Sequence, residues 1–226
     1  MAQLFNPAMN SIARVSILGV IILVACAGMV AWNVENSPFI TRQGEAGAQP
    51  VPFSHEHHVG GLGIDCRYCH TSVETSPVAG LPATKVCMTC HSQIWTNAQM
   101  LQPIRDSWRN NTPIAWTRVH SLPGFVFFDH SIHINKGIGC ASCHGKVDEM
   151  PLMWKDKSLQ MQWCLQCHRD PESALRPRNE VFNLHYDAAH DPAHPGATQE
   201  SLGRELKEQY HLLPRQQLEN CSTCHR

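Results

Sequence analysis

The longest apolar run in the chain lies near its N-terminus. Residues 15–34 contain no charged side chain, and Arg14 and Glu35 bracket them. Twenty helical residues span about 30 Å, which matches the hydrocarbon core of a bilayer. Trp32 would lie at the outer interface, where such side chains are favoured. The pattern predicts a transmembrane helix over residues 14–34, preceded by a short N-terminal segment, 1–13.

A cleaved signal peptide and a lipoprotein signal are the two other interpretations of this run. It is longer than a usual signal core and has no clear small-x-small cleavage site. Leu23-Val24-Ala25-Cys26 resembles a lipobox, which would make Cys26 a lipidated N-terminus. Length favours the intact helix, in which Cys26 is a small buried apolar residue.

Downstream of this helix the hydrophobic pattern becomes sparse. Residues 35–52 are rich in Gly, Pro and polar side chains and indicate a linker. Residues 53–226 show little apolar periodicity, which predicts a mainly α-helical fold of short helices with extensive irregular structure, and 197–212 is the best helix candidate. Residues 169–196 have no periodicity and four prolines. They are a candidate for wrapping a neighbouring subunit.

Composition shows that this C-terminal part needs something other than side chains for its core. Residues 53–226 are rich in His, Pro, Gly and Cys, and a chain of this kind could not easily bury an ordinary apolar core. The whole chain of 226 residues has 18 basic and 19 acidic side chains. This balance gives no indication of nucleic-acid binding.

Ten of the eleven cysteines occur in five copies of Cys-x-x-Cys-His, and only Cys26 lies outside them. The motif is typical of covalent c-type haem attachment. Two thiols three positions apart reach the vinyl groups on one porphyrin edge, and the next residue, His, becomes an axial iron ligand. The attachment residues are Cys66 and Cys69, Cys87 and Cys90, Cys140 and Cys143, Cys164 and Cys167, and Cys221 and Cys224, followed by the proximal ligands His70, His91, His144, His168 and His225.

Zinc sites and disulfides are the competing interpretations of these cysteines. Cys-x-x-Cys pairs with nearby His also build zinc sites, and an even number of cysteines is compatible with disulfides. A zinc domain would not place His directly after the second Cys in all five copies, and a disulfide gives that His no role. The sequence therefore predicts five covalently bound haems, which themselves form the core.

An internal repeat organises the haem domain, 53–226. Phe-x-His-x-x-His occurs at 53–58 and again at 128–133, and each copy is followed by Gly-Ile-x-Cys and then by a second haem motif. Residues 53–91 and 128–168 are therefore interpreted as two copies of a di-haem module. The fifth haem motif lies at 221–225.

The pattern is similar to small multihaem cytochromes of the c3 and c7 type, and this similarity implies distal iron ligands. In those proteins the first His of His-x-x-His ligates the haem just downstream, and the second ligates a neighbouring haem. His55 would then serve the Cys66 haem and His130 the Cys140 haem, while His58 and His133 would each reach another haem. His57 has no counterpart in the second module and is expected to be exposed.

Five irons with two histidine ligands each require a fifth distal ligand. We favour His120, because it stands just before the second module, over the other candidates His185, His190, His194 and His211. Methionine is the alternative sixth ligand and would raise a haem's potential. The methionine candidates are Met88, Met100, Met150, Met153 and Met161.

Taken together, the sequence resembles the pentahaem cytochrome c subunit of bacterial alternative complex III, a quinol:electron-acceptor oxidoreductase. The resemblance rests on residues 51–55, 63–70, 128–133, 139–140, 163–168 and 221–226, and it is looser over 169–210. It implies a membrane respiratory subunit with no catalytic site of its own. Because c-type haem is attached outside the bacterial cytoplasmic membrane, the haem domain is expected on the periplasmic side and residues 1–13 in the cytoplasm.

The resemblance also implies partners. Quinol would be oxidised by a polytopic quinol-binding subunit, and electrons would pass through the iron–sulfur clusters of a molybdopterin-oxidoreductase-like subunit. This chain would then conduct them to a mono-haem cytochrome, a soluble periplasmic cytochrome c or a terminal oxidase.

Two other functions remain as alternatives. A stand-alone membrane quinol dehydrogenase that feeds periplasmic reductases also has one helix and four or five haems, but it places its first haem motif close to the helix. Here more than 30 residues separate Val34 from Cys66. A multihaem enzyme such as a nitrite reductase needs an iron with an open position, whereas this sequence offers enough histidines to close all five.

The absence of a side-chain core leads to a prediction about the haem-free protein. Because about 35 residues remain for each haem, the apo-protein is expected to stay unfolded, as small metal-dependent domains do. Circular dichroism of a haem-free preparation checks this. A helical spectrum that melts cooperatively would contradict it.

Overall fold

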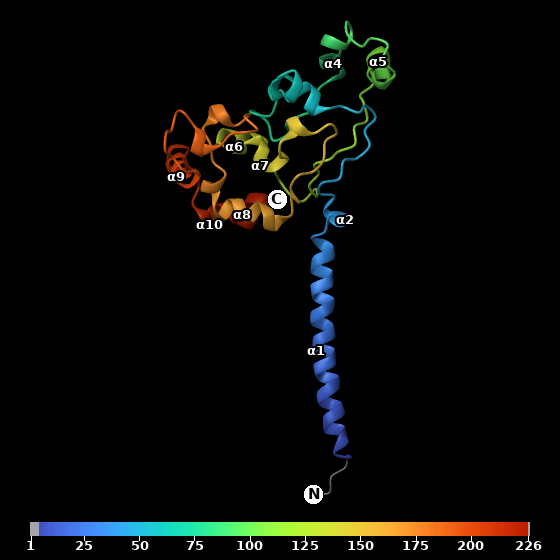
Figure 1. The fold of residues 1–226 in the computed structure, drawn as a ribbon, viewed down its shortest axis with the longest axis vertical. Helices are drawn as coiled ribbons and strands as arrows, with labels where there is room; N and C mark the ends of the chain where they lie inside the picture. The colour runs from blue at the N-terminus through green and yellow to red at the C-terminus, as the bar shows by residue number, and fades with distance from the viewer. Residues whose placement is uncertain (1–4, 226) are drawn as a thin grey trace. The chain divides into compact units, whose positions relative to one another are not determined.

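The computed structural model describes residues 5–225. Contacts divide the chain into two units, one ending at Gln43 and the other beginning at Gly44 (Figure 1). The first contains the predicted apolar helix, α1 (Ala8–Glu35), and one short turn, α2 (Pro38–Thr41). In the described part of the chain, α1 is the one helix long and apolar enough to cross a membrane. Its length and composition fit a membrane anchor or a signal sequence, and Cys26 is exposed on it.

The amino acids at the end of α1 explain why it stops there. Asn36 folds its side-chain amide back onto the carbonyl of Trp32 at 2.8 Å, which satisfies one of the last orphan carbonyls. Pro38 lacks an N–H and cannot continue the helix, but it suits the first turn of α2. The helix begins at Ala8, six residues before the predicted start at position 14.

The second unit consists of short helices joined by irregular chain, as predicted. It contains a π-helix, η1 (Glu56–Gly61), and the helices α3 (Cys66–Cys69), α4 (Thr84–His91), α5 (Gln102–Asn110), α6 (His130–Asn135), α7 (Cys140–His144), α8 (Met161–Arg169), α9 (Gln199–Gln209), α10 (Arg215–Leu218) and α11 (Cys221–Cys224). Five 3-10 turns lie between them: η2 (Gln99–Leu101), η3 (Val147–Glu149), η4 (Pro171–Ser173), η5 (Arg178–Glu180) and η6 (Ala188–His190). Within residues 5–225, β-structure is limited to isolated bridges.

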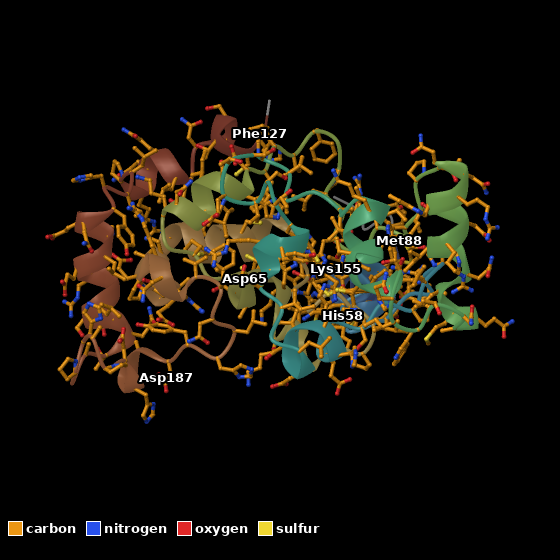
Figure 2. All side chains as sticks on the ribbon, turned by 90° about the horizontal axis from the view of Figure 1, so that it is seen from above. His58, Asp65, Met88, Phe127, Lys155 and Asp187 are labelled. Carbon is orange, nitrogen blue, oxygen red and sulfur yellow. The ribbon has the colours of Figure 1, made fainter. Side chains whose placement is uncertain are left out.

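The helices of the second unit are spread along its length. In both views α4 and α5 lie at one end and α9 at the opposite end, with α6 and α7 between them (Figures 1 and 2). The expected helix at 197–212 is present as α9, and Thr198 and Ser201 form a reciprocal capping box at its start. Its buried face consists of Leu202, Gly203 and Leu206.

Buried side chains form four small clusters in place of one continuous core. The largest contains Ile138, Leu175, Ala188, Leu202, Leu206 and Tyr210. The other three, each with three buried members, surround Leu101, Val181 and Met150. A domain of this size ordinarily has one contiguous apolar core. The fragmentation agrees with the expectation that haems provide the core, which stays a prediction.

The segment 169–196 packs against its own domain. Leu175, Val181 and Leu184 are at most 8% exposed and contribute to three different clusters. These three side chains are therefore not available to a neighbouring subunit, and the expectation that the segment wraps one stays a prediction. These side chains are irregularly spaced along a Pro-rich loop, so no apolar periodicity in the sequence predicted their burial.

The second half of the predicted linker also belongs to the folded domain. The N–H of Gly44 donates to the carbonyl of Lys155 at 2.8 Å, and Ala46 forms an isolated bridge with Trp154. Val51 is only 2% exposed and packs with Leu101. Residues 44–52 are therefore held to the domain mainly through their backbone, which is compatible with their polar composition.

The close approach of α9 to η4 gives a stability prediction. A Cβ at Gly203 would meet the carbonyl of Glu172 inside contact distance, so Gly203→Ala forces the two backbones apart. Overpacking of this kind costs about 1–3 kcal/mol, more than the helix propensity of Ala returns. We expect a lower Tm for the haem-loaded protein by circular dichroism. Gly47→Ala, where a Cβ meets open space, is the matched control, and equal Tm values for both variants would contradict the prediction.

Candidate functional site

Each Cys-x-x-Cys pair occupies a single helical turn. Residues three apart on a helix lie on one face, so both thiols of a pair point to the same side. The shortest of these helices, α3 and α11, are held by side-chain caps. Asp65 accepts from the N–H of Arg67 at 2.8 Å, and Asn220 accepts from the N–H of Ser222 at 3.1 Å. Asx caps of this kind allow a four-residue helix to start where the motif starts.

Eight of the ten motif cysteines are partly buried, and Cys90 and Cys221 are exposed. None of the cysteines forms a disulfide within residues 5–225. Burial raises the pKa of Cys140 and of Cys143 to about 12. Among residues 5–225 no group of three or more His, Cys, Asp or Glu side chains is placed to hold a bare metal ion. The arrangement of pairs suits two attachment points on one porphyrin edge.

Main-chain carbonyls orient four of the five motif histidines, His70, His91, His168 and His225. Nδ1 of His70 lies 2.8 Å from the carbonyl oxygen of Gly80, and Nδ1 of His168 lies 2.9 Å from that of Leu218. His91 and His225 make the same contact at 3.3 Å with the carbonyls of Ile94 and Phe125. A ring that donates from Nδ1 to a carbonyl presents an unprotonated Nε2, the form in which imidazole binds a metal.

The two Phe-x-His-x-x-His segments have the same three-dimensional arrangement. Phe53 contacts His55 edge-on at 4.9 Å and stacks on His58 at 4.4 Å. Phe128 contacts His130 edge-on at 4.8 Å and stacks on His133 at 4.6 Å. In each copy Nδ1 of the second His lies 2.7–2.8 Å from the carbonyl oxygen four residues earlier. The phenyl ring therefore fixes two imidazoles at once.

Three pairs of histidine rings have the separation that a shared metal ion requires. An imidazole–metal bond is about 2.0–2.1 Å long, so two rings on opposite sides of one metal have centres roughly 6 Å apart. The ring centres of His58 and His91 are 6.3 Å apart, and those of His133 and His168 are 6.2 Å apart. His130 and His144 are 6.3 Å apart and nearly parallel. Each pair joins a Phe-x-His-x-x-His segment to a haem motif, so these residues fit bis-His haem iron.

His120 differs from the other candidates for the fifth distal position. Its Nε2 is buried and has no hydrogen-bond partner, and burial lowers its pKa to about 4. A buried imidazole nitrogen without a partner is costly, and a metal bond would satisfy it. The ring centre of His120 lies 4.3 Å from that of His144, which is too close for one iron to fit between them.

The remaining histidines are bound to carboxylates or exposed to solvent. A ring nitrogen of His185 lies 2.6 Å from Asp148, that of His190 2.7 Å from Asp187, and that of His194 3.0 Å from Asp191. His57 is exposed, as expected, and so is His211. Their positions distinguish them from His120.

His55 lies beside the first motif and is less completely paired than its counterpart in the second module. Burial, and after it the neighbouring charge of His70, lowers the pKa of His55 to about 4. Its Nδ1 is buried without a partner, whereas Nδ1 of His130 lies 2.8 Å from the carbonyl oxygen of Pro77.

The methionine candidates occupy varied positions. Met150 is 1% exposed and packs with Val147 and Leu184, while Met161 is 65% exposed. Met88 packs against the cluster of Val51 and Leu101, as does its neighbour Cys87 in α4. Met100 is exposed and Met153 is partly buried. Packing therefore accounts for Met88, Met150 and Met153.

The sequence contains little sign of the carbonyl groups that orient the rings. Gly80 and Pro77 lie between the first two motifs, and Leu218 precedes the fifth. A backbone acceptor is available at every residue, so side-chain chemistry does not mark it. The Pro and Gly between the first two motifs are the only local signal, because they predict the turn that brings the carbonyls to the rings.

Comparison with known proteins shows a likeness to multihaem cytochromes c. Residues 126–226 match the family model described as cytochrome c7 and related cytochrome c, which implies covalently bound c-type haem. The multiheme cytochrome c subunit of a menaquinone reductase from Nitratidesulfovibrio vulgaris is 28% identical over 141 residues, 53% of this chain and 67% of that protein. Cytochrome c-552 of Desulfotalea psychrophila is 33% identical over 63 residues, 25% of this chain and 12% of that protein.

Proposed function

We propose that this chain, whose C-terminal part is a cytochrome c7-like multihaem domain, is a membrane-anchored pentahaem cytochrome c. It conducts electrons between partner proteins and has no catalytic site of its own. The observation that carries the proposal is the set of three imidazole pairs separated by 6.2–6.3 Å. Each pair connects a repeated His-x-x-His segment to a Cys-x-x-Cys-His motif.

The proposed ligand set has two histidines for each of five irons. His91, His144 and His168 are paired with His58, His130 and His133 by distance. By analogy between the two modules, His55 is assigned to the motif of His70. His120 is then left for the motif of His225. Bound haem supplies reversible one-electron chemistry whose potential depends on axial ligands and burial.

The chain's own residues hold and orient the imidazoles. Carbonyl acceptors fix the rings of His70 and His168, and Phe53 and Phe128 fix those of the two His-x-x-His segments. With both axial positions taken by histidine, no position stays open for a substrate, and catalysis at a metal generally needs one. The protein's contribution is therefore ligation, spacing and burial.

We further propose that α1 anchors the protein in the bacterial cytoplasmic membrane with the haem domain on the periplasmic side. Its length and uninterrupted apolar composition support an anchor. In alternative complex III, as the sequence resemblance implies, this chain would receive electrons from quinol oxidation through an iron–sulfur subunit. It would pass them to a periplasmic cytochrome c or a terminal oxidase.

A second candidate follows from the menaquinone reductase relative. That protein is named as the multiheme cytochrome c subunit of such an enzyme. In a complex of that type this chain would deliver electrons toward menaquinone, opposite to the direction in alternative complex III. Both candidates place a multihaem subunit beside quinone-reactive membrane partners, and the partners distinguish them.

Native membranes provide the test of the complex. Membranes extracted in mild detergent are separated on a native gel, the gel is stained for haem, and the proteins of the haem band are identified by mass spectrometry. We expect a large assembly with an iron–sulfur subunit and polytopic membrane subunits. A haem band containing this chain alone would reject both complexes and favour the stand-alone quinol dehydrogenase. Quinol oxidation or menaquinone reduction by the purified assembly then decides the direction.

The ligand set predicts the effect of removing His120. His120→Ala takes away one axial ligand, so one haem of five is expected to become high-spin in electron paramagnetic resonance spectra. His120→Met is expected to keep that haem low-spin and raise its potential in a spectroelectrochemical titration. His190→Ala, which removes an exposed ring paired with Asp187, is the control and should leave all five low-spin. Five low-spin haems in His120→Ala would contradict the assignment.

A further inference from the structure

Contacts between the haem motifs show that their order in space differs from their order along the chain. We propose that the second motif lies at one end, that the first motif follows it, and that the third and fourth come next, with the fifth beside the fourth. This inference rests on the proposed haem occupancy. It makes the first motif the connection through which electrons pass between the two modules.

The second motif lies beside the first. The hydroxyl groups of Tyr68, in the first motif, and Thr89, in the second, are 2.8 Å apart. His58, which precedes the first motif, is the ring that faces His91 of the second. The other side of the second motif packs against Leu101 and the helix α5.

The first motif also contacts the third. Val73, just after the first motif, shares a buried cluster with Ile134 and with Cys140 of the third motif. The carbonyl of Pro77 accepts from the ring of His130, and the carbonyl of Glu74 accepts from the side chain of Asn135 at 3.0 Å. The turn after the first motif therefore packs onto the second module.

The fourth motif continues this series and meets the fifth. Ile138, just before the third motif, packs in a cluster that includes Cys167 of the fourth. His168 of the fourth motif is oriented by the carbonyl of Leu218, which lies just before the fifth. The guanidinium of Arg169 pairs with Glu219. The fifth motif therefore lies beside the fourth.

Figure 2 shows how the first two motifs lie along the second unit. Met88, in the second motif, lies toward one end, and Asp65, just before the first motif, lies between Met88 and the opposite end, where Asp187 is found. Each transfer moves one electron from a ferrous iron to a neighbouring ferric iron, with no bond made or broken. In the proposed order an electron on the second haem reaches the third through the first. In chain order it would pass from the second to the third directly.

Photochemical electron injection tests the order in the full-length protein. Arg109, an exposed side chain on α5 that shares a surface hollow with Met88, is replaced by Cys in a Cys26→Ser background and labelled with a ruthenium photoreductant. His130→Met marks the third haem spectroscopically by changing its axial ligand. Transient absorption then follows electron arrival at the marked haem.

Removal of the first haem should interrupt the transfer. In the Cys66→Ser, Cys69→Ser variant we expect loss of electron arrival at the marked third haem. The matched variant Cys221→Ser, Cys224→Ser, which removes a haem beyond the third, should retain it. Arrival at an unchanged rate without the first haem would overturn the proposed order.

A second measurement keeps the test decisive if the protein without its first haem fails to assemble. In a haem-complete protein, His55→Met marks the first haem instead. When the electron is injected from the label at position 109, the marked first haem should be reduced before the third and fourth haems. When it is injected from a label on Gln216→Cys in α10, an exposed position near the fifth motif, the marked first haem should be reduced after the third and fourth. The opposite sequence of arrivals would overturn the inference.

The two levels of the proposal fail in different ways. Haem stoichiometry and spin state are measured on the unmodified protein before any flash. Fewer than five haems, or haems that are not low-spin, contradict the proposed function. Five low-spin haems with the other order of arrival contradict only the spatial order.

Discussion

The hydrogen bond from an imidazole Nδ1 to a main-chain carbonyl is the interaction on which this domain depends. It recurs at His70 and His168 and in both Phe-x-His-x-x-His segments. It fixes the tautomer and the direction of a ring without using another side chain. A domain with few residues for each cofactor can therefore define many metal ligands with backbone atoms alone. The short helices, turns and irregular segments serve mainly to bring carbonyls to rings.

The same constraint accounts for the small side-chain clusters. A backbone that bends to orient rings forms few long helices with continuous apolar faces. α9 is the exception in the second unit, and its buried Leu202 and Leu206 belong to the largest cluster. Elsewhere, apolar side chains such as Leu175 and Val181 are buried one at a time from loops. Stability then comes from separate local contacts and, in the proposed holo-protein, from porphyrin surface.

The sequence predicted those features that have a side-chain signature. The uncharged run before Glu35 predicted α1, the cysteine spacing predicted the haem motifs, and the Phe-x-His-x-x-His repeat predicted two segments that are alike in the structure. It did not predict the burial of 169–196 or the packing of residues 44–52, because irregular backbone has no periodicity to read. The sequence also did not predict that the carbonyls of Gly80 and Leu218 orient the rings of His70 and His168. The partner of each distal ring also depends on long-range contacts, so the sequence could not predict that the rings of His133 and His168 lie 6.2 Å apart.

The carbonyl of Pro77 connects the two halves of the repeat. It belongs to the first module, but it orients His130 of the second, and the corresponding nitrogen of His55 has no such partner. The modules are therefore alike in sequence and unequal in structure. The first module depends on the second in turn, because the N–H of Glu56 donates to the carbonyl of Met150 and Val59 packs against Val147 and Met150. If the repeat arose by duplication, the two copies have since become dependent on each other. A single module cut from this chain would lose part of its own metal site along with its neighbour, so evolution by adding or deleting modules is constrained to keep both.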